Sequence, residues 1–142
     1  MHIDTQTVQN AFSEILSSDK KNFSALEKSL KDSTKKDIHV NIVHAKPNTN
    51  LFVMCITPDK STLTKIAEAM YSDKTMLSTI SELWKRCNSW RLDIDDRIFD
   101  FLTPAELTAV TLHEIGHVAD SDAIPTRIQN IIQFSVVTSE DK

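Results

Sequence analysis

The chain has 142 residues, of which 40% are hydrophobic and 25% charged, and these values are typical of one ordinary globular domain. Its net charge of −4, without any basic stripe, argues against nucleic acid as a partner. No apolar run approaches the roughly 20 residues that cross a bilayer, and the first residues do not resemble a signal peptide, so neither a membrane span nor secretion is expected.

The first 36 residues are expected to form two helices. Apolar residues recur at helical spacing from 5 to 17 and again from 23 to 30, and the second helix ends in the polar stretch 31–36. We interpret residues 1–36 as a helical N-terminal arm that either extends from the core or packs on it. Residues 37–142 form that core, in one domain.

Two strands and two helices are expected next. Residues 38–43 alternate between apolar and polar side chains, and residues 51–56 are a continuous apolar run. The turn-rich residues 46–50 between them favour a hairpin or two neighbouring strands. Apolar spacing then predicts helices over about 61–71 and 73–84, with Asp73 as N-cap of the second.

A third strand and a well-defined helix follow. Residues 90–94 alternate between apolar and polar side chains, which predicts a half-buried strand. Thr103 suits the N-cap of the next helix, Pro104 suits its first position, and Glu106 completes a capping box. We expect this helix to run from Pro104 to about Ala119.

The sequence His-Glu-Ile-Gly-His within this helix carries the chemistry. His113 and His117 are four residues apart, so their imidazoles point the same way and can share one metal ion. Glu114 is rotated by about 100° around the helix, which keeps it out of the metal's coordination shell but within reach of a metal-bound water. The chain's single glycine, Gly116, costs helix stability at this position, by about 1 kcal/mol relative to alanine.

Residues 103–118, with the two histidines near their end, resemble the active-site helix of the zincin metallopeptidases. The resemblance implies an α+β fold in which a small mixed β-sheet packs on the zinc helix. It also implies Zn²⁺ as cofactor and a peptide or protein as substrate. In that fold an edge strand before the helix borders the substrate cleft, and the residues in the matching place are Trp90, Arg91, Leu92, Asp93 and Ile94.

The third zinc ligand is not apparent from the sequence. Metzincins place a third histidine where this chain has Ala123. Asp122 instead gives the pattern H-E-x-x-H-x-x-x-x-D, which is similar to the CAAX-prenyl-protease-like family among the gluzincins. Those proteins take a glutamate from a later helix, for which Glu140 is a weak candidate. Asp120 and Asp122 are better suited to hydrogen-bond a zinc-binding histidine than to bind the ion. The resemblance also implies that a C-terminal part of such a site is missing.

The sequence therefore predicts zinc-dependent peptide hydrolysis, with His113 and His117 as ligands and Glu114 as general base. The alternative is a catalytically inactive zincin-like protein with a structural or interaction role, since predicted peptidase domains carried by phage and mobile-element particles also resemble this helix. Cys55 and Cys87 are expected to be buried thiols, which favours the cytoplasm, or a virion if the protein is phage-encoded.

Overall fold

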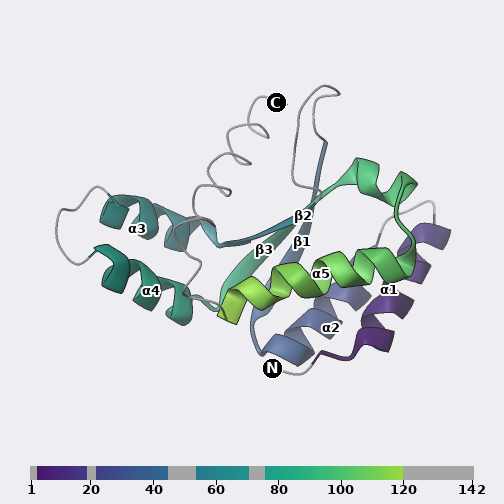
Figure 1. The fold of residues 1–142 in the computed structure, drawn as a ribbon, viewed down its shortest axis with the longest axis horizontal. Coiled ribbons are helices and arrows are strands. Elements are labelled where there is room, and N and C mark those ends of the chain that lie inside the picture. The colour runs from purple at the N-terminus through teal and green to yellow at the C-terminus, as the bar shows by residue number, and fades with distance from the viewer. Residues whose placement is uncertain (1–2, 19–21, 45–53, 71–75, 120–142) are drawn as a thin grey trace.

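Helices surround a small mixed sheet, so the α+β class expected from the sequence is confirmed (Figure 1). The computed structural model describes residues 3–18, 22–44, 54–70 and 76–119. In chain order the elements of this part are α1 (Thr5–Ser17), α2 (Ser24–Thr34), β1 (Asp37–Val43), β2 (Met54–Pro58), α3 (Lys60–Met70), α4 (Met76–Arg86), β3 (Ser89–Asp95), the 3-10 helix η1 (Asp96–Asp100) and α5 (Pro104–Ala119). The expected turn at 46–50 and the N-cap Asp73 lie outside the described residues.

The strand order of the sheet is β1-β3-β2, and it corrects two expectations. β1 pairs with β3 in parallel and β2 pairs with β3 antiparallel, so β1 and β2 are neither a hairpin nor neighbours. The segment Trp90–Ile94 was expected to be an edge strand, but it is the middle of β3, the central strand. Both of its backbone edges are therefore occupied by other strands, and it cannot pair with a substrate peptide.

The polar positions of β3 explain why it was misassigned. Asp93 is only 1% exposed, and its carboxylate accepts hydrogen bonds from Asn41 Nδ2 at 2.9 Å and from Arg91 Nε at 3.1 Å. Asp95 is also buried and is paired with Arg97. On the polar side of β3, Asp93 and Asp95 are thus buried with partners while Arg91 is exposed, so the polar positions do not mark a face that is open to water throughout.

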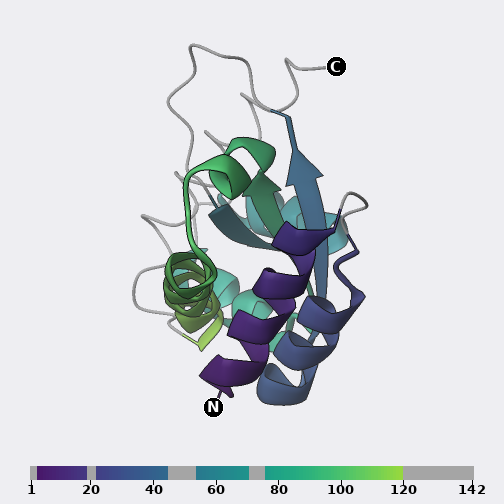
Figure 2. The ribbon, with the colours of Figure 1, turned by 90° about the vertical axis from the view of Figure 1, so that its right-hand side faces the viewer.

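Three helices cover the apolar face of the sheet. Figure 2 shows α5, α1 and α2 side by side, with α1 in the middle, and α5 contacts β2 while α2 contacts β1. The first two helices, in the segment expected to form an arm, contribute fully buried side chains to the same core as the sheet. Among the largest fully buried side chains are Phe12, Ile15, Leu26, Leu30, Ile56, Leu92, Ile94 and Leu107.

The remaining two helices, α3 and α4, pack on each other at the other end of the molecule (Figure 1). The side chain of Trp84 from α4 reaches the core, where it meets Trp90 of β3 edge to face with ring centroids 4.9 Å apart. This contact ties α4 to the centre of the sheet. Within the described residues, no helix is both long enough and apolar enough to span a membrane.

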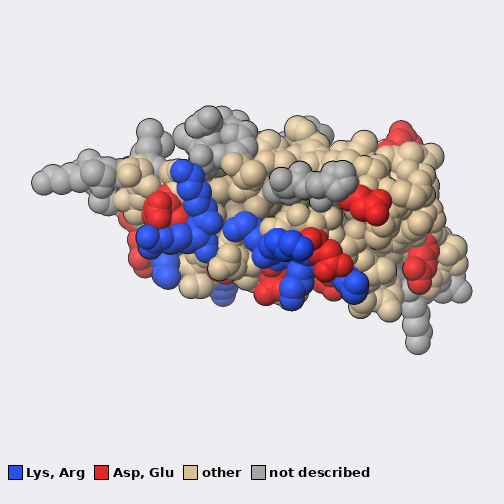
Figure 3. Space-filling view, turned by 90° about the horizontal axis from the view of Figure 1, so that it is seen from below, with Lys and Arg blue, Asp and Glu red and all other residues tan. Residues whose placement is uncertain are grey.

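Basic and acidic side chains are intermixed on the face seen in Figure 3. The described residues form exposed ion pairs, among them Lys28 with Asp32, Lys31 with Asp37, and Arg86 with Glu82. Exposed pairs of this kind are worth between about 0 and 1 kcal/mol each. They leave the apolar core as the main source of stability in the described part of the chain.

Candidate metal centre

Local sequence signals set the start of α5, and the capping box predicted for it is confirmed. The backbone N–H of Glu106 donates to Thr103 Oγ1 at 3.2 Å, and the backbone N–H of Thr103 donates to Glu106 Oε1 at 3.0 Å. The hydrogen bond from the Thr103 backbone N–H, and after it one with the Thr103 side chain, hold the pKa of the Glu106 carboxyl below its usual value. The helix then runs from Pro104 to Ala119, as predicted, and carries the His-Glu-Ile-Gly-His sequence in its second half.

The two histidines of the motif face each other. His113 Nε2 and His117 Nε2 are 3.3 Å apart, and the ring planes are nearly perpendicular at 89°. Two nitrogens bound tetrahedrally to one zinc ion at 2.0–2.1 Å are separated by about 3.4 Å. The spacing therefore suits a shared metal ion, although it also suits a hydrogen bond between two neutral imidazoles. His113 is exposed and His117 is half-buried, so this group opens to the surface.

Glu114 completes the group from a buried position. Its side chain is 6% exposed, and Oε1 accepts a hydrogen bond from the backbone N–H of Ile56 in β2 at 3.1 Å. One carboxylate oxygen and one ring nitrogen of each histidine all lie within 4.8 Å of one another. Glu114 is thus close enough either to approach a metal ion or to contact a water molecule bound to one.

Two contacts from outside the motif hold the helix that carries it. The indole Nε1 of Trp84 donates to the backbone oxygen of His117 at 3.0 Å, and the hydroxyl of Thr111 lies 3.4 Å from Met54 Sδ in β2. Residues far apart in the chain therefore fix α5 against both α4 and β2. Nothing in the sequence indicated that the side chain of Trp84 or the backbone of Ile56 would reach the site.

Gly116 lies on the exposed side of α5. A Cβ atom built at this position meets nothing within 4 Å, and the backbone φ angle is not positive. Neither close packing nor an unusual backbone conformation therefore requires a glycine here. Among the described residues, none approaches the position that a Gly116 side chain would occupy.

Two further histidines of the described chain have other neighbours. His39 Nδ1 lies 4.0 Å from Glu27 Oε2, and His44 Nδ1 lies 2.6 Å from Asp96 Oδ2. The possible third ligand and the possible hydrogen-bond partners of the histidines, at positions 120, 122 and 140, lie outside the described residues. Of the described residues, only His113, Glu114 and His117 form a group able to hold a metal ion.

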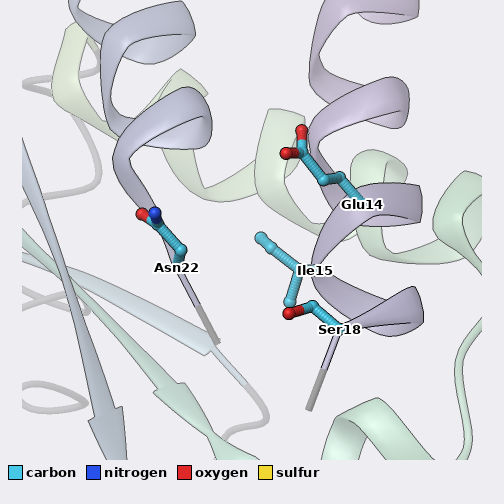
Figure 4. A pocket seen from close by; sticks show the side chains of 4 residues that line it. All are labelled: Glu14, Ile15, Ser18 and Asn22. Carbon is cyan, nitrogen blue, oxygen red and sulfur yellow. The ribbon is translucent and has the colours of Figure 1, made fainter. Parts of the chain in front are cut away.

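A small cavity lies elsewhere, between the end of α1 and the start of α2 (Figure 4). It has a volume of about 250 Å³ and is lined by Glu14, Ile15, Ser18 and Asn22. It shares no residue with the histidine group, so it has no part in chemistry at that group.

Comparisons with known proteins add no family to this description. The chain matches no family model, and it has no significant match among curated proteins or among solved structures. The candidate metal centre therefore stands on its own geometry and on its residue types.

Proposed function

We propose that this protein is a zinc-dependent metallopeptidase of the zincin type. The observation that supports this best is the 3.3 Å separation of His113 Nε2 and His117 Nε2, with the carboxylate of Glu114 beside them. Two imidazoles and a carboxylate are ligand types that zinc prefers, and the separation of the two nitrogens fits a tetrahedral site. His113 and His117 would hold the ion.

Each residue of the group has a defined task in peptide hydrolysis. Zinc, when bound, lowers the pKa of a coordinated water toward about 7 and polarises the carbonyl of the scissile bond. Glu114 takes the proton from the attacking water onto its carboxylate and passes it to the leaving amine. The hydrogen bond from Ile56 N–H fixes the direction of that carboxylate. Since β2 is an edge strand next to α5, an extended peptide near the histidines would run beside β2.

The alternative function is a zincin-like protein that binds metal, or keeps only the fold, in a structural or interaction role. Two observations favour it. In the part of the chain that the structure describes, only Glu114, which the proposal uses as the base, lies with His113 and His117 in a group able to hold a metal ion, and the segment Trp90–Ile94 is a central strand that cannot receive a substrate. The two functions differ in one measurable property, which is turnover.

Wild-type protein and three variants test the proposal, two of them for metal binding and one for catalysis. Wild-type protein is expected to bind about one zinc ion per chain, more weakly than a site with three protein ligands. His113→Ala is expected to lose that zinc, whereas His39→Ala, which removes an exposed histidine outside the motif, is expected to keep it. Emission spectroscopy after dialysis measures the zinc content of each protein. An equal zinc content in wild type and His113→Ala would show that the motif is not the metal site.

Glu114→Gln then tests catalysis. Glutamine is nearly isosteric and retains an oxygen that can accept the bond from Ile56, so zinc and fold should be kept. Loss of a general base costs about 10²–10⁴-fold in rate, which a peptide-library assay can detect. Equal cleavage by wild type and Glu114→Gln would indicate a contaminating protease. Zinc binding without any cleavage by wild type would favour the structural role.

A further inference from the structure

We propose that Trp84 is a positioning residue of the metal site, which it serves by holding the turn of α5 that carries His117. This inference rests on the proposed function. Trp84 lies on α4, 33 residues before the histidine in the chain, yet its indole N–H donates to the backbone oxygen of His117 at 3.0 Å. This bond joins α4 to the motif.

The bond from Trp84 falls on the turn of α5 that carries one of the two histidines. His117 Nε2 lies 3.3 Å from His113 Nε2, and this separation depends on the position of that turn relative to the one before it. The indole N–H holds the turn from outside the helix, by its bond to the backbone oxygen of His117. Loss of this bond would allow the turn to shift and the separation between the two Nε2 atoms to change.

The donor is itself held rigidly. The side chain of Trp84 is 1% exposed and packs edge to face against Trp90, whose own N–H donates to the backbone oxygen of Cys87 at 2.9 Å. Burial among core side chains therefore fixes the direction of the Trp84 indole N–H. Phenylalanine at position 90 would retain an aromatic ring for the edge-to-face contact, so this direction does not depend on the Trp90 N–H.

The same pair of tryptophans supplies a matched control. Both side chains are fully buried, and each donates one hydrogen bond to a backbone oxygen. Trp84→Phe and Trp90→Phe each remove one buried N–H and part of one ring, so both should destabilise the fold to a similar extent. Only Trp84→Phe removes a bond to a metal-binding residue. The chain has two tryptophans, so each variant also leaves a single fluorophore.

The experiment measures zinc affinity by competition with a chromophoric chelator, for wild type and both variants. Loss of a group that orients a metal ligand typically costs about 10-fold or more in metal affinity. We expect Trp84→Phe to bind zinc about 10-fold more weakly than wild type, and Trp90→Phe to stay within about twofold of it. Equal affinities of the two variants would overturn the positioning role.

Fluorescence gives a second readout that does not depend on the stability of Trp84→Phe. In Trp90→Phe, zinc should shift the emission of Trp84. The reason is that the indole N–H donates to the backbone of His117, the residue whose imidazole would bind the positively charged ion. An emission spectrum unchanged at saturating zinc would overturn the inference. If wild type binds no zinc, the proposed function fails and the inference with it. If wild type binds zinc and the two variants behave alike, only the positioning role fails.

Discussion

Glu114 is a carboxylate in a place where a carboxylate is costly. Burial of an ionised side chain is unfavourable unless hydrogen bonds or opposite charges compensate it. The N–H of Ile56 provides one such bond, and it comes from backbone, which a substitution at that position would not remove. A metal ion held by the neighbouring histidines would provide the opposite charge. A cation at the site would thus add to the compensation that the hydrogen bond already gives.

Gly116 offers a test of whether the motif is under functional constraint. Because an added Cβ meets nothing within 4 Å, Gly116→Ala should fit without strain. It should raise the free energy of unfolding by roughly 0.5–1 kcal/mol, since alanine is the better helix former. Urea denaturation checks this. A loss of stability would mean that the space beside Gly116 is occupied.

At the scale of single residues, the sequence alone was sufficient to predict contacts between residues that are close together in one helix. The i, i+4 spacing of His113 and His117 was sufficient to predict that their imidazoles would meet, because helix geometry fixes that relation. It was not sufficient to predict that Trp84 and Ile56 would contact the motif. Both reach the motif through hydrogen bonds that span more than 30 residues of chain, and those contacts depend on the tertiary fold.

At the scale of elements, helices were predicted well and the sheet was not. The helix over 5–17 and the capped helix from Pro104 carry their own start signals and apolar spacing. Strand neighbours are set by contacts between distant segments, and a turn-rich linker is compatible with several pairings. The polar residues of the strand at 90–94 were interpreted as facing solvent. Arg91 is indeed exposed, but Asp93 is buried with Asn41, a partner 52 residues away in the sequence that no local pattern indicates.

Asp93 makes the polar side of β3 sensitive to pH. Burial raises the pKa of its carboxyl above the usual 3.8, against the opposing effects of hydrogen bonds from Asn41 and the charge of Arg91. Between 3.8 and the higher folded value, the native state holds a proton that the unfolded chain releases. The contribution of Asp93 to the free energy of unfolding therefore falls as pH rises through this window, and is constant above it.

Asp93→Asn has no such titration, so it isolates the effect. The free energy of unfolding of wild type minus that of the variant should decrease as pH rises from about 4, and then level off. Denaturant unfolding at a series of pH values measures it. A difference that grows with pH would contradict the direction of the shift, and would mean that Asp93 is stabilised in its ionised form. Asp32→Asn, at an exposed carboxylate, serves as the control.

At the scale of the whole molecule, metal binding should stabilise the entire described fold. α5 contacts α1, β2 and α4, so an ion that binds only the folded helix shifts the folding equilibrium of all of them. Zinc at about one hundred times its Kd should add about 2.7 kcal/mol and raise Tm by roughly 10 °C. Calorimetry with zinc, then with excess chelator, measures this. His113→Ala should show no increase, and an equal increase in that variant would place the ion elsewhere.

The position of β3 between β1 and β2 has a consequence for how the chain reaches this fold. Asn41 and Asp93, neighbours across the sheet, are 52 residues apart in sequence, and such distant pairings form slowly. During synthesis β1 and β2 leave the ribosome well before their common partner. Until β3 arrives, the hairpin that their sequence favours is an available mispairing, and it must open again to admit the central strand. The pairing that local sequence suggests is thus a competitor of the native state.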